Sequence, residues 1–142
     1  MSLWIFDTDH VSLSQRFHPN VIYRSGLIAP DALYTTVITV EEQMQGWLKA
    51  IRKASPNPGS SKLTWAYDGL KDAVGYFNVS NVLGFSSEAQ ATFINLRKTT
   101  RIGSQDLKIA SIVLFHNGIL VTRNRRDFER VPGLQIEDWS SS

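Results

Sequence analysis

The sequence predicts an α/β protein that forms a single domain over residues 1–142, with a central, mostly parallel sheet flanked by helices. Two observations support this fold class. Short runs of apolar and β-branched residues alternate with longer segments of helical periodicity, which is the pattern of repeated strand–helix units. Polar and acidic residues directly follow the apolar runs, at the strand ends where parallel sheets collect their functional groups.

The first half of the chain supplies two predicted strands and three helices. The apolar run at 3–6 predicts a buried strand that ends at Asp7, and a short helix after it would be capped by Asp9 or Ser12. A second helix is predicted over 21–27. Residues 33–38 are β-branched and aromatic and predict the second strand, and Thr39 would then start a helix to about residue 53.

The second half continues the alternation after a loop rich in Pro, Gly and Ser at 56–61, whose flanks suggest no domain boundary. Ser86 or Ser87 would cap one helix and Ser104 another, and the left-handed conformation of Gly118 would end the latter. The remaining predictions are a helix at 63–74, a strand within 78–85, a strand at 119–122, a turn at 131–133 and an edge strand at 134–137.

The composition excludes several kinds of functional site. The chain has no cysteine, which excludes disulfides, thiolate metal sites and a thiol nucleophile. Its N-terminus lacks the basic start of a signal peptide, and no run approaches the roughly 20 apolar residues of a membrane span. We therefore expect a cytoplasmic protein without a membrane partner.

Basic residues form two clusters although the net charge is only +2. Such clusters are either solvated surface or contacts to phosphate groups. The two clusters are Arg97, Lys98 and Arg101, and Arg123, Arg125, Arg126 and Arg130.

Acidic side chains follow several predicted strands. Asp7 ends the first strand, Glu42 lies in the first turn of the helix after the second, and Asp106 lies in the first turn of the helix from Ser104. Asn124 and Asp127 follow the strand at 119–122. Crowded carboxylates repel unless a cation neutralises them, and oxygen ligands suit Mg²⁺ or Mn²⁺, which activate water against phosphodiesters.

Each acid also has a structural explanation. Thr39 and Glu42 have the spacing of a capping box, and Asp106 could simply complement the dipole of its helix. Asp127 could be a solvated acid among arginines. Asp7 is harder to explain structurally, because a buried carboxylate is rarely left without a partner.

Four segments resemble the PIN-domain ribonucleases, and most of all the VapC-type toxins of bacterial toxin–antitoxin pairs. The blocks stand in that family's order and at its spacing, and they cover essentially the whole chain. They are IFDTDH near the start, ITVEEQMQG at 38–46, IGSQDLKIAS at 102–111 and LVTRNRRDFERVPGLQIEDW at 120–139.

The resemblance implies a Rossmann-like three-layer fold and RNA cleavage that depends on Mg²⁺ or Mn²⁺. Asp7, Glu42 (rather than Glu41) and Asp106 match the family's catalytic, metal-binding acids. Asn124 stands where many members carry a fourth acid, and other members place an acid at the position of Asp127; Asp9 could add further charge. The resemblance also implies a cognate antitoxin and a homodimer.

Further side chains are expected around the acids. Several polar residues would hydrogen-bond the carboxylates or the substrate phosphate, namely Thr8, Ser104, Thr122 and Asn124. Three arginines would meet the RNA backbone or, equally, an antitoxin or solvent: Arg123, Arg125 and Arg126. His10 and His18 are expected at the surface, and the four tryptophans in the core or at a partner surface.

Two other functions fit parts of the sequence. The run from Ile5 to Val11 has the Asp-x-Asp pattern of haloacid-dehalogenase-type phosphatases, in which Asp7 would be the nucleophile and Asp9 the general acid. The uncertain fourth acid also leaves open a PIN-like module that has lost catalysis and only binds protein.

Overall fold

The computed structural model describes residues 2–141, and the chain divides into two compact units. One unit comprises Met1–Thr39 together with Asn81–Ser142, and the other comprises Val40–Ser80. The expectation of one domain over 1–142 stays a prediction.

The first unit is built on a five-stranded sheet and its flanking helices. Its strands are β1 (Trp4–Phe6), β2 (Leu33–Thr36), β3 (Val82–Leu83), β4 (Ile119–Val121) and β5 (Gln135–Glu137). Its helices are α1 (Thr8–Gln15), α2 (Pro19–Ser25), the 3₁₀ helix η1 (Pro30–Ala32), α5 (Ser87–Arg97), α6 (Ser104–Phe115) and α7 (Arg125–Phe128). Helix α3 (Val37–Ala54) starts in this unit and runs into the second, which also holds α4 (Ser61–Asn78).

All four strand pairs of the sheet are parallel, in the order β3-β2-β1-β4-β5. The chain moves outward from β1 to β2 and β3, then returns to the other side of β1 for β4 and β5. The strand order therefore switches at β1, and ligands of such sheets bind at the carboxyl ends of the strands beside this switch. Phe6 pairs with Val121, so the residues that follow β1 and β4 emerge next to each other.

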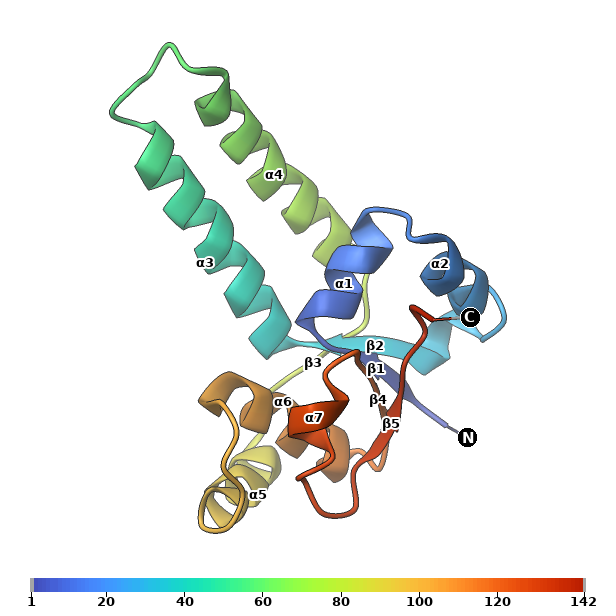
Figure 1. The fold of residues 1–142 in the computed structure, drawn as a ribbon. Coiled ribbons are helices and arrows are strands. Elements are labelled where there is room, and N and C mark those ends of the chain that lie inside the picture. The colour runs from blue at the N-terminus through green and yellow to red at the C-terminus, as the bar shows by residue number, and fades with distance from the viewer. Residues whose placement is uncertain (1, 142) are drawn as a thin grey trace. The chain divides into compact units, whose positions relative to one another are not determined.

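Helices cover both faces of the sheet, with α1 and α2 on one side and α5 and α6 on the other (Figure 1). The side chains of β1 alternate between these layers, as a strand requires. Ile5 joins the core formed with α5 and α6, whereas Phe6 packs edge-on against Trp139 at 5.4 Å between ring centroids. The predicted α/β class with a parallel sheet between helices is confirmed.

Several helices begin at residues other than those expected, α2 at Pro19 and α4 at Ser61 among them. Asp7 itself caps α1, instead of Asp9 or Ser12. Helix α3 begins at Val37, where the Thr36 hydroxyl accepts the backbone N–H of Thr39 at 3.3 Å. The capping box at Thr39 is therefore wrong, because Thr39 already lies inside the helix.

The start of α3 at Val37 also moves Glu42 beyond its first turn, which contains no acid. Helix α6 starts at Ser104, and its N-cap is Gly103. No side-chain hydrogen bond caps the described N-terminus of this helix, so the predicted cap at Ser104 is wrong. Asp106 does lie in the first turn of α6, as predicted, and Ser86 caps α5.

The end of α6 depends on two residues with different roles. Asn117, not Gly118, takes the left-handed conformation, with φ of 52°. Gly118 is required for another reason, because a Cβ there would lie 2.7 Å from Ile5 Cδ1 and 3.2 Å from the Leu3 carbonyl oxygen. The glycine lets the start of β4 approach β1.

The second unit is a pair of helices formed by most of α3 and by α4. The ring of Trp47 packs over Gly69, where a Cβ would meet ring atoms at 2.2 Å. Trp47 also contacts Trp65 with 5.0 Å between ring centroids, although Trp65 remains 60% exposed. The predicted loop at 56–61 joins the two helices. Within residues 2–141, no helix has the length and apolar character needed to cross a bilayer.

Candidate active site

The site is organised around Asp7, which ends β1 and caps α1. Its carboxylate is almost fully buried, with 6% of the residue exposed. Oδ1 accepts the backbone N–H of His10 at 2.7 Å, and Oδ2 accepts the hydroxyl of Thr122 at 2.6 Å. The partly positive N-terminus of α1 adds a favourable field for this negative charge. The buried carboxylate is thus held by two directed hydrogen bonds.

Thr122 connects Asp7 to the segment that follows β4. The residue is fully buried, and its hydroxyl both donates to Asp7 and accepts the backbone N–H of Asn124 at 2.9 Å. The parallel register of β1 and β4 brings the two strand ends side by side. The expected contact between Thr122 and a carboxylate is therefore present.

His10 is part of the same arrangement, contrary to its expected surface position. It is fully buried, and its Nε2 accepts the backbone N–H of Trp139 at 3.3 Å. The neutral ring then carries its proton on Nδ1. Nδ1 lies 3.4 Å from Asp7 Oδ1, a favourable electrostatic contact whose geometry falls short of a hydrogen bond. The three-residue spacing from Asp7 is a sequence signal for the contact between the two side chains, though not for the burial of His10.

Asp138 lies on the other side of the imidazole and was not singled out from the sequence. Its Oδ1 is 3.6 Å from His10 Nε2 and accepts the hydroxyl and the backbone N–H of Ser140 at 2.6 and 2.8 Å. Burial raises the pKa of Asp138, but the two hydrogen bonds from Ser140 and the nearby His10 and Arg125 outweigh it, so the net shift is downward.

Asn124 and Asp127 are hydrogen-bonded to each other at the start of α7. Asn124 caps this short helix, with its Oδ1 accepting the backbone N–H of Asp127 at 3.4 Å. Its Nδ2 donates to Asp127 Oδ2 at 3.1 Å. The two candidates for a fourth ligand therefore lie in one hydrogen-bonded turn, directly after Thr122.

Two of the three arginines expected to meet RNA are paired with acids. Arg123 makes a bidentate contact with Asp9, with Nε and Nη2 at 2.6 and 2.9 Å from the carboxylate oxygens. This hydrogen bond and the charge of Asp9 raise the pKa of Arg123. Arg125 lies 3.7 Å from Glu129 in an exposed pair. Asp9 is thus bound to a guanidinium at the surface.

The remaining candidates lie in different parts of the chain. Thr8 follows Asp7 in the sequence, and its hydroxyl lies 3.1 Å from the hydroxyl of Thr39. Asp106 is half-buried in the first turn of α6. Glu42 lies on α3 within the second unit, so its approach to Asp7 and Asp106 stays a prediction. Among residues 2–141, no three His, Asp or Glu side chains form a ready metal-binding group.

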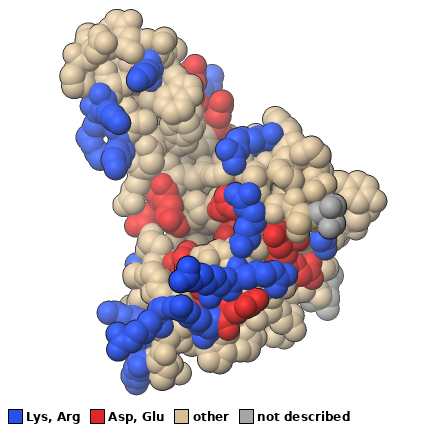
Figure 2. All heavy atoms as spheres, viewed as in Figure 1, with Lys and Arg blue, Asp and Glu red and all other residues tan. Residues whose placement is uncertain are grey.

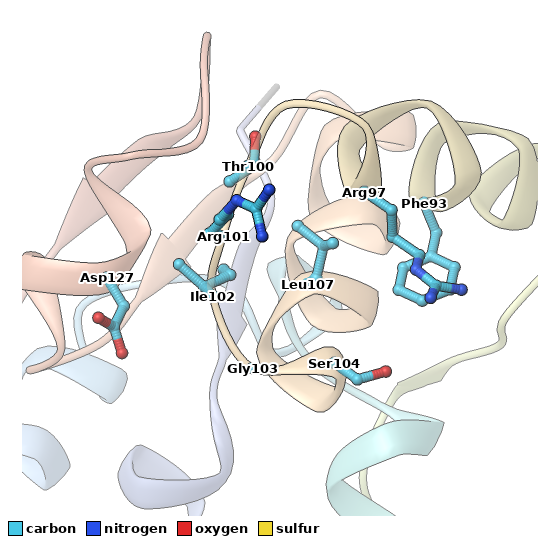
Figure 3. Close-up of a pocket in the computed structure, with 9 residues that line it drawn as sticks. All are labelled: Phe93, Arg97, Thr100, Arg101, Ile102, Gly103, Ser104, Leu107 and Asp127. Carbon is cyan, nitrogen blue, oxygen red and sulfur yellow. The ribbon is translucent and has the colours of Figure 1, made fainter.

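Positive charge gathers near the acids of the first unit. Figure 2 shows Lys and Arg side chains over the region of α5, α6 and α7. A cavity of about 540 Å³ opens in the same region, lined by Arg97, Arg101, Ser104 and Asp127 among others (Figure 3).

Comparison with known proteins finds relatives that share the name VapC. No family model matches the chain. A tRNA(fMet)-specific endonuclease VapC of Salmonella typhimurium is 46% identical over 43 residues, which cover 30% of this chain and only 33% of that protein. The ribonuclease VapC1 of Haemophilus influenzae is 28% identical over 143 residues, covering 97% of this chain and 98% of the relative.

A solved structure extends this likeness to the fold. The crystal structure of DNA-bound VapBC from Salmonella typhimurium matches with a TM-score of 0.76 and 26% identity, over 98% of this chain and 99% of that one. Over nearly its full length, the chain is therefore similar in sequence to a VapC ribonuclease and in fold to the VapBC structure.

Proposed function

We propose that the chain is a metal-dependent endoribonuclease that acts as the toxin of a toxin–antitoxin pair. One observation supports it above the others: the buried Asp7 carboxylate stands at the point where the strand order switches, held by Thr122 and beside His10. Relatives named as VapC ribonucleases match the chain, some of them over nearly its whole length.

The donor groups of this region fit a hard divalent cation. Each Asp7 oxygen accepts one hydrogen bond, and a carboxylate oxygen offers two lone pairs, so both oxygens retain a lone pair for a cation. The other candidates, Asp106, Glu42, Asp127 and Asn124, also offer oxygen, which Mg²⁺ and Mn²⁺ prefer over the nitrogen and sulfur that zinc takes.

In this proposal Asp7 and Asp106 hold the cation, and Glu42 holds it or positions the attacking water. A bound Mg²⁺ or Mn²⁺ supplies the charge that activates water and stabilises the leaving oxygen of the phosphodiester. Thr122 and the backbone N–H of His10 orient the Asp7 carboxylate. His10 Nδ1, 3.4 Å from Asp7 Oδ1, adds an electrostatic contact to the same carboxylate.

The partners follow from the same proposal. RNA is the substrate, and a cognate antitoxin inhibits the enzyme; several of the similar solved structures are VapBC complexes. We also propose a homodimer. The phosphatase alternative loses support because both oxygens of Asp9, its general acid, accept hydrogen bonds from Arg123.

The test is RNA cleavage with Mg²⁺ or Mn²⁺, followed with and without EDTA. Asp7→Asn and Asp106→Asn should each reduce the rate at least about 100-fold, as expected for a group that supports charge in the transition state. Asparagine caps helices as well as aspartate does, so Asp7→Asn removes charge while the fold is kept.

Asp31→Asn is the matched control, since Asp31 is an exposed acid at the start of η1 and should leave the rate unchanged. Cleavage that resists EDTA, or that survives both asparagine substitutions, would refute the proposal. A folded protein that neither cleaves RNA nor gains thermal stability with Mn²⁺ would instead be a catalytically silent binding module.

A further inference from the structure

Two arginines, Arg97 and Arg101, line the cavity beside α5 and α6. Arg24, Arg123 and Arg125 each lie within 4 Å of a carboxylate. Within residues 2–141, neither Arg97 nor Arg101 makes such an ion pair. Two unneutralised guanidinium groups lining one hollow attract an anion there more strongly than a surface of paired charges does.

Neighbouring groups fix the guanidinium of Arg97 and the backbone of Arg101. The guanidinium of Arg97 stacks over the ring of Phe93 at 5.5 Å, an arrangement that fixes its position while leaving its N–H edges open. The backbone of Arg101 is tied down because Arg130 donates to its carbonyl oxygen at 3.1 Å. Figure 3 shows both side chains along the cavity, with Asp127 apart from them beyond Ile102.

The cavity lining is mixed, and part of it leads towards the acids. Phe93 and Leu107 line it but are nearly buried, whereas the half-buried Ile102 offers an apolar surface to a base or a ribose. Ser104 and Asp127 also line it, and Ser104 lies two residues before Asp106 on α6. A volume of about 540 Å³ lies within the range of small-ligand pockets, roughly 300–1,000 Å³.

We infer that this cavity binds one nucleotide of the RNA strand next to the scissile bond, with Arg97 and Arg101 on its phosphate. Arginine suits this role because its planar guanidinium donates two parallel hydrogen bonds to phosphate oxygens. The inference rests on the proposed ribonuclease function and adds a substrate subsite to it. An acidic peptide would find the same charges but would leave the apolar surface of Ile102 unused.

The inference is tested by binding a labelled single-stranded RNA of about 12 nucleotides in EDTA, where no cleavage occurs. Arg97→Gln and Arg101→Gln should each weaken binding about tenfold. Each should also make the plot of log affinity against log salt shallower by about 0.7, the contribution of one phosphate contact on a single strand. Lys98→Gln is the matched control, because it removes one neighbouring charge that does not line the cavity.

Cleavage kinetics provide the second measurement. The double variant at positions 97 and 101 should raise KM with little change in kcat, as expected for binding that substrate and transition state share. If this variant binds RNA with wild-type affinity and salt dependence while the enzyme still cleaves RNA, the subsite is wrong and the proposed function stands. If the wild-type protein neither binds nor cleaves RNA, both fail.

The acidic-peptide alternative has its own outcome. An oligoglutamate peptide that displaces RNA as well as unlabelled RNA does, and loses the same affinity in the double variant, would assign the cavity to a protein ligand and overturn the inference. A loss of affinity for Lys98→Gln equal to that of the arginine variants would also overturn it, since the effect would then come from charge alone.

Discussion

Replacement of Thr122 by valine tests whether the residue that follows β4 stabilises the buried carboxylate of Asp7. Valine has nearly the same shape but lacks the hydroxyl that donates to Asp7 and accepts the N–H of Asn124. Loss of a hydrogen bond to an ionised carboxylate costs about 1.5–3 kcal/mol, and the stranded N–H costs about 1 kcal/mol more. The added methyl group returns roughly 0.8 kcal/mol. We therefore expect a loss of about 2–3 kcal/mol in the free energy of unfolding.

Urea unfolding, monitored by circular dichroism, measures this loss in the wild-type and Asp7→Asn backgrounds. Because an amide at position 7 carries no charge, Thr122→Val should cost about 1–2 kcal/mol less in that background. Thr122→Ser keeps the hydroxyl and is the control, with a coupling to position 7 close to zero. The Val variant should also lose roughly 10- to 100-fold in Mn²⁺ affinity. A Val substitution that costs the same in both backgrounds would refute the idea that Thr122 acts through Asp7.

Three further predictions concern packing, pH and metal. Gly69→Ala should destabilise the protein by about 1–3 kcal/mol, because its Cβ would meet the ring of Trp47. Gly75→Ala is the control: a Cβ there has no neighbour within 4 Å, and the change should stabilise the helix by about 0.5–1 kcal/mol. Urea unfolding that shifts in the same direction for both variants would contradict this. The folded-state pKa of Asp138 is lowered, so its stabilisation is present at neutral pH and is lost as the pH falls from its unfolded value near 3.8 towards the lower folded value. Ser140→Ala should therefore reduce the melting temperature at pH 7 and have less effect at pH 3, and an equal effect at both pH values would contradict it. Mn²⁺ at about 100 times its Kd should stabilise the native state by about 2.7 kcal/mol in a thermal melt, and an unchanged melting temperature would argue against a metal site.

Strands and their following acids were predictable because they depend on local patterns. The apolar run before Asp7 and the β-branched run before Thr36 define strands within a few residues of their observed ends. The position of Asp7 at a strand end then follows from parallel topology. Asp106 in the first turn of α6 was likewise visible in the sequence, because it depends only on where that helix begins.

Other features depend on residues far apart in the chain. His10 is buried because Trp139, 129 residues later in the sequence, lies beside it and donates its backbone N–H to the imidazole. No local pattern around His10 contains that information. The exact helix starts were missed for a different reason: Gly103 caps α6 although serine follows it, since the backbone reaches helical geometry only at Ser104. Local propensity ranks candidate caps, but the path of the chain out of the preceding loop selects one.

The pairing of Arg123 with Asp9 has a consequence for how a polyanion approaches this region. The carboxylate occupies the guanidinium edge that a phosphate would need, at 2.6 and 2.9 Å. Asp9 therefore acts as a competitor carried by the chain itself, and an incoming strand gains at Arg123 only the difference between two anions. This pairing weakens non-specific binding of nucleic acid at Arg123 and leaves the first contact with a polyanion to basic side chains that are not paired with an acid.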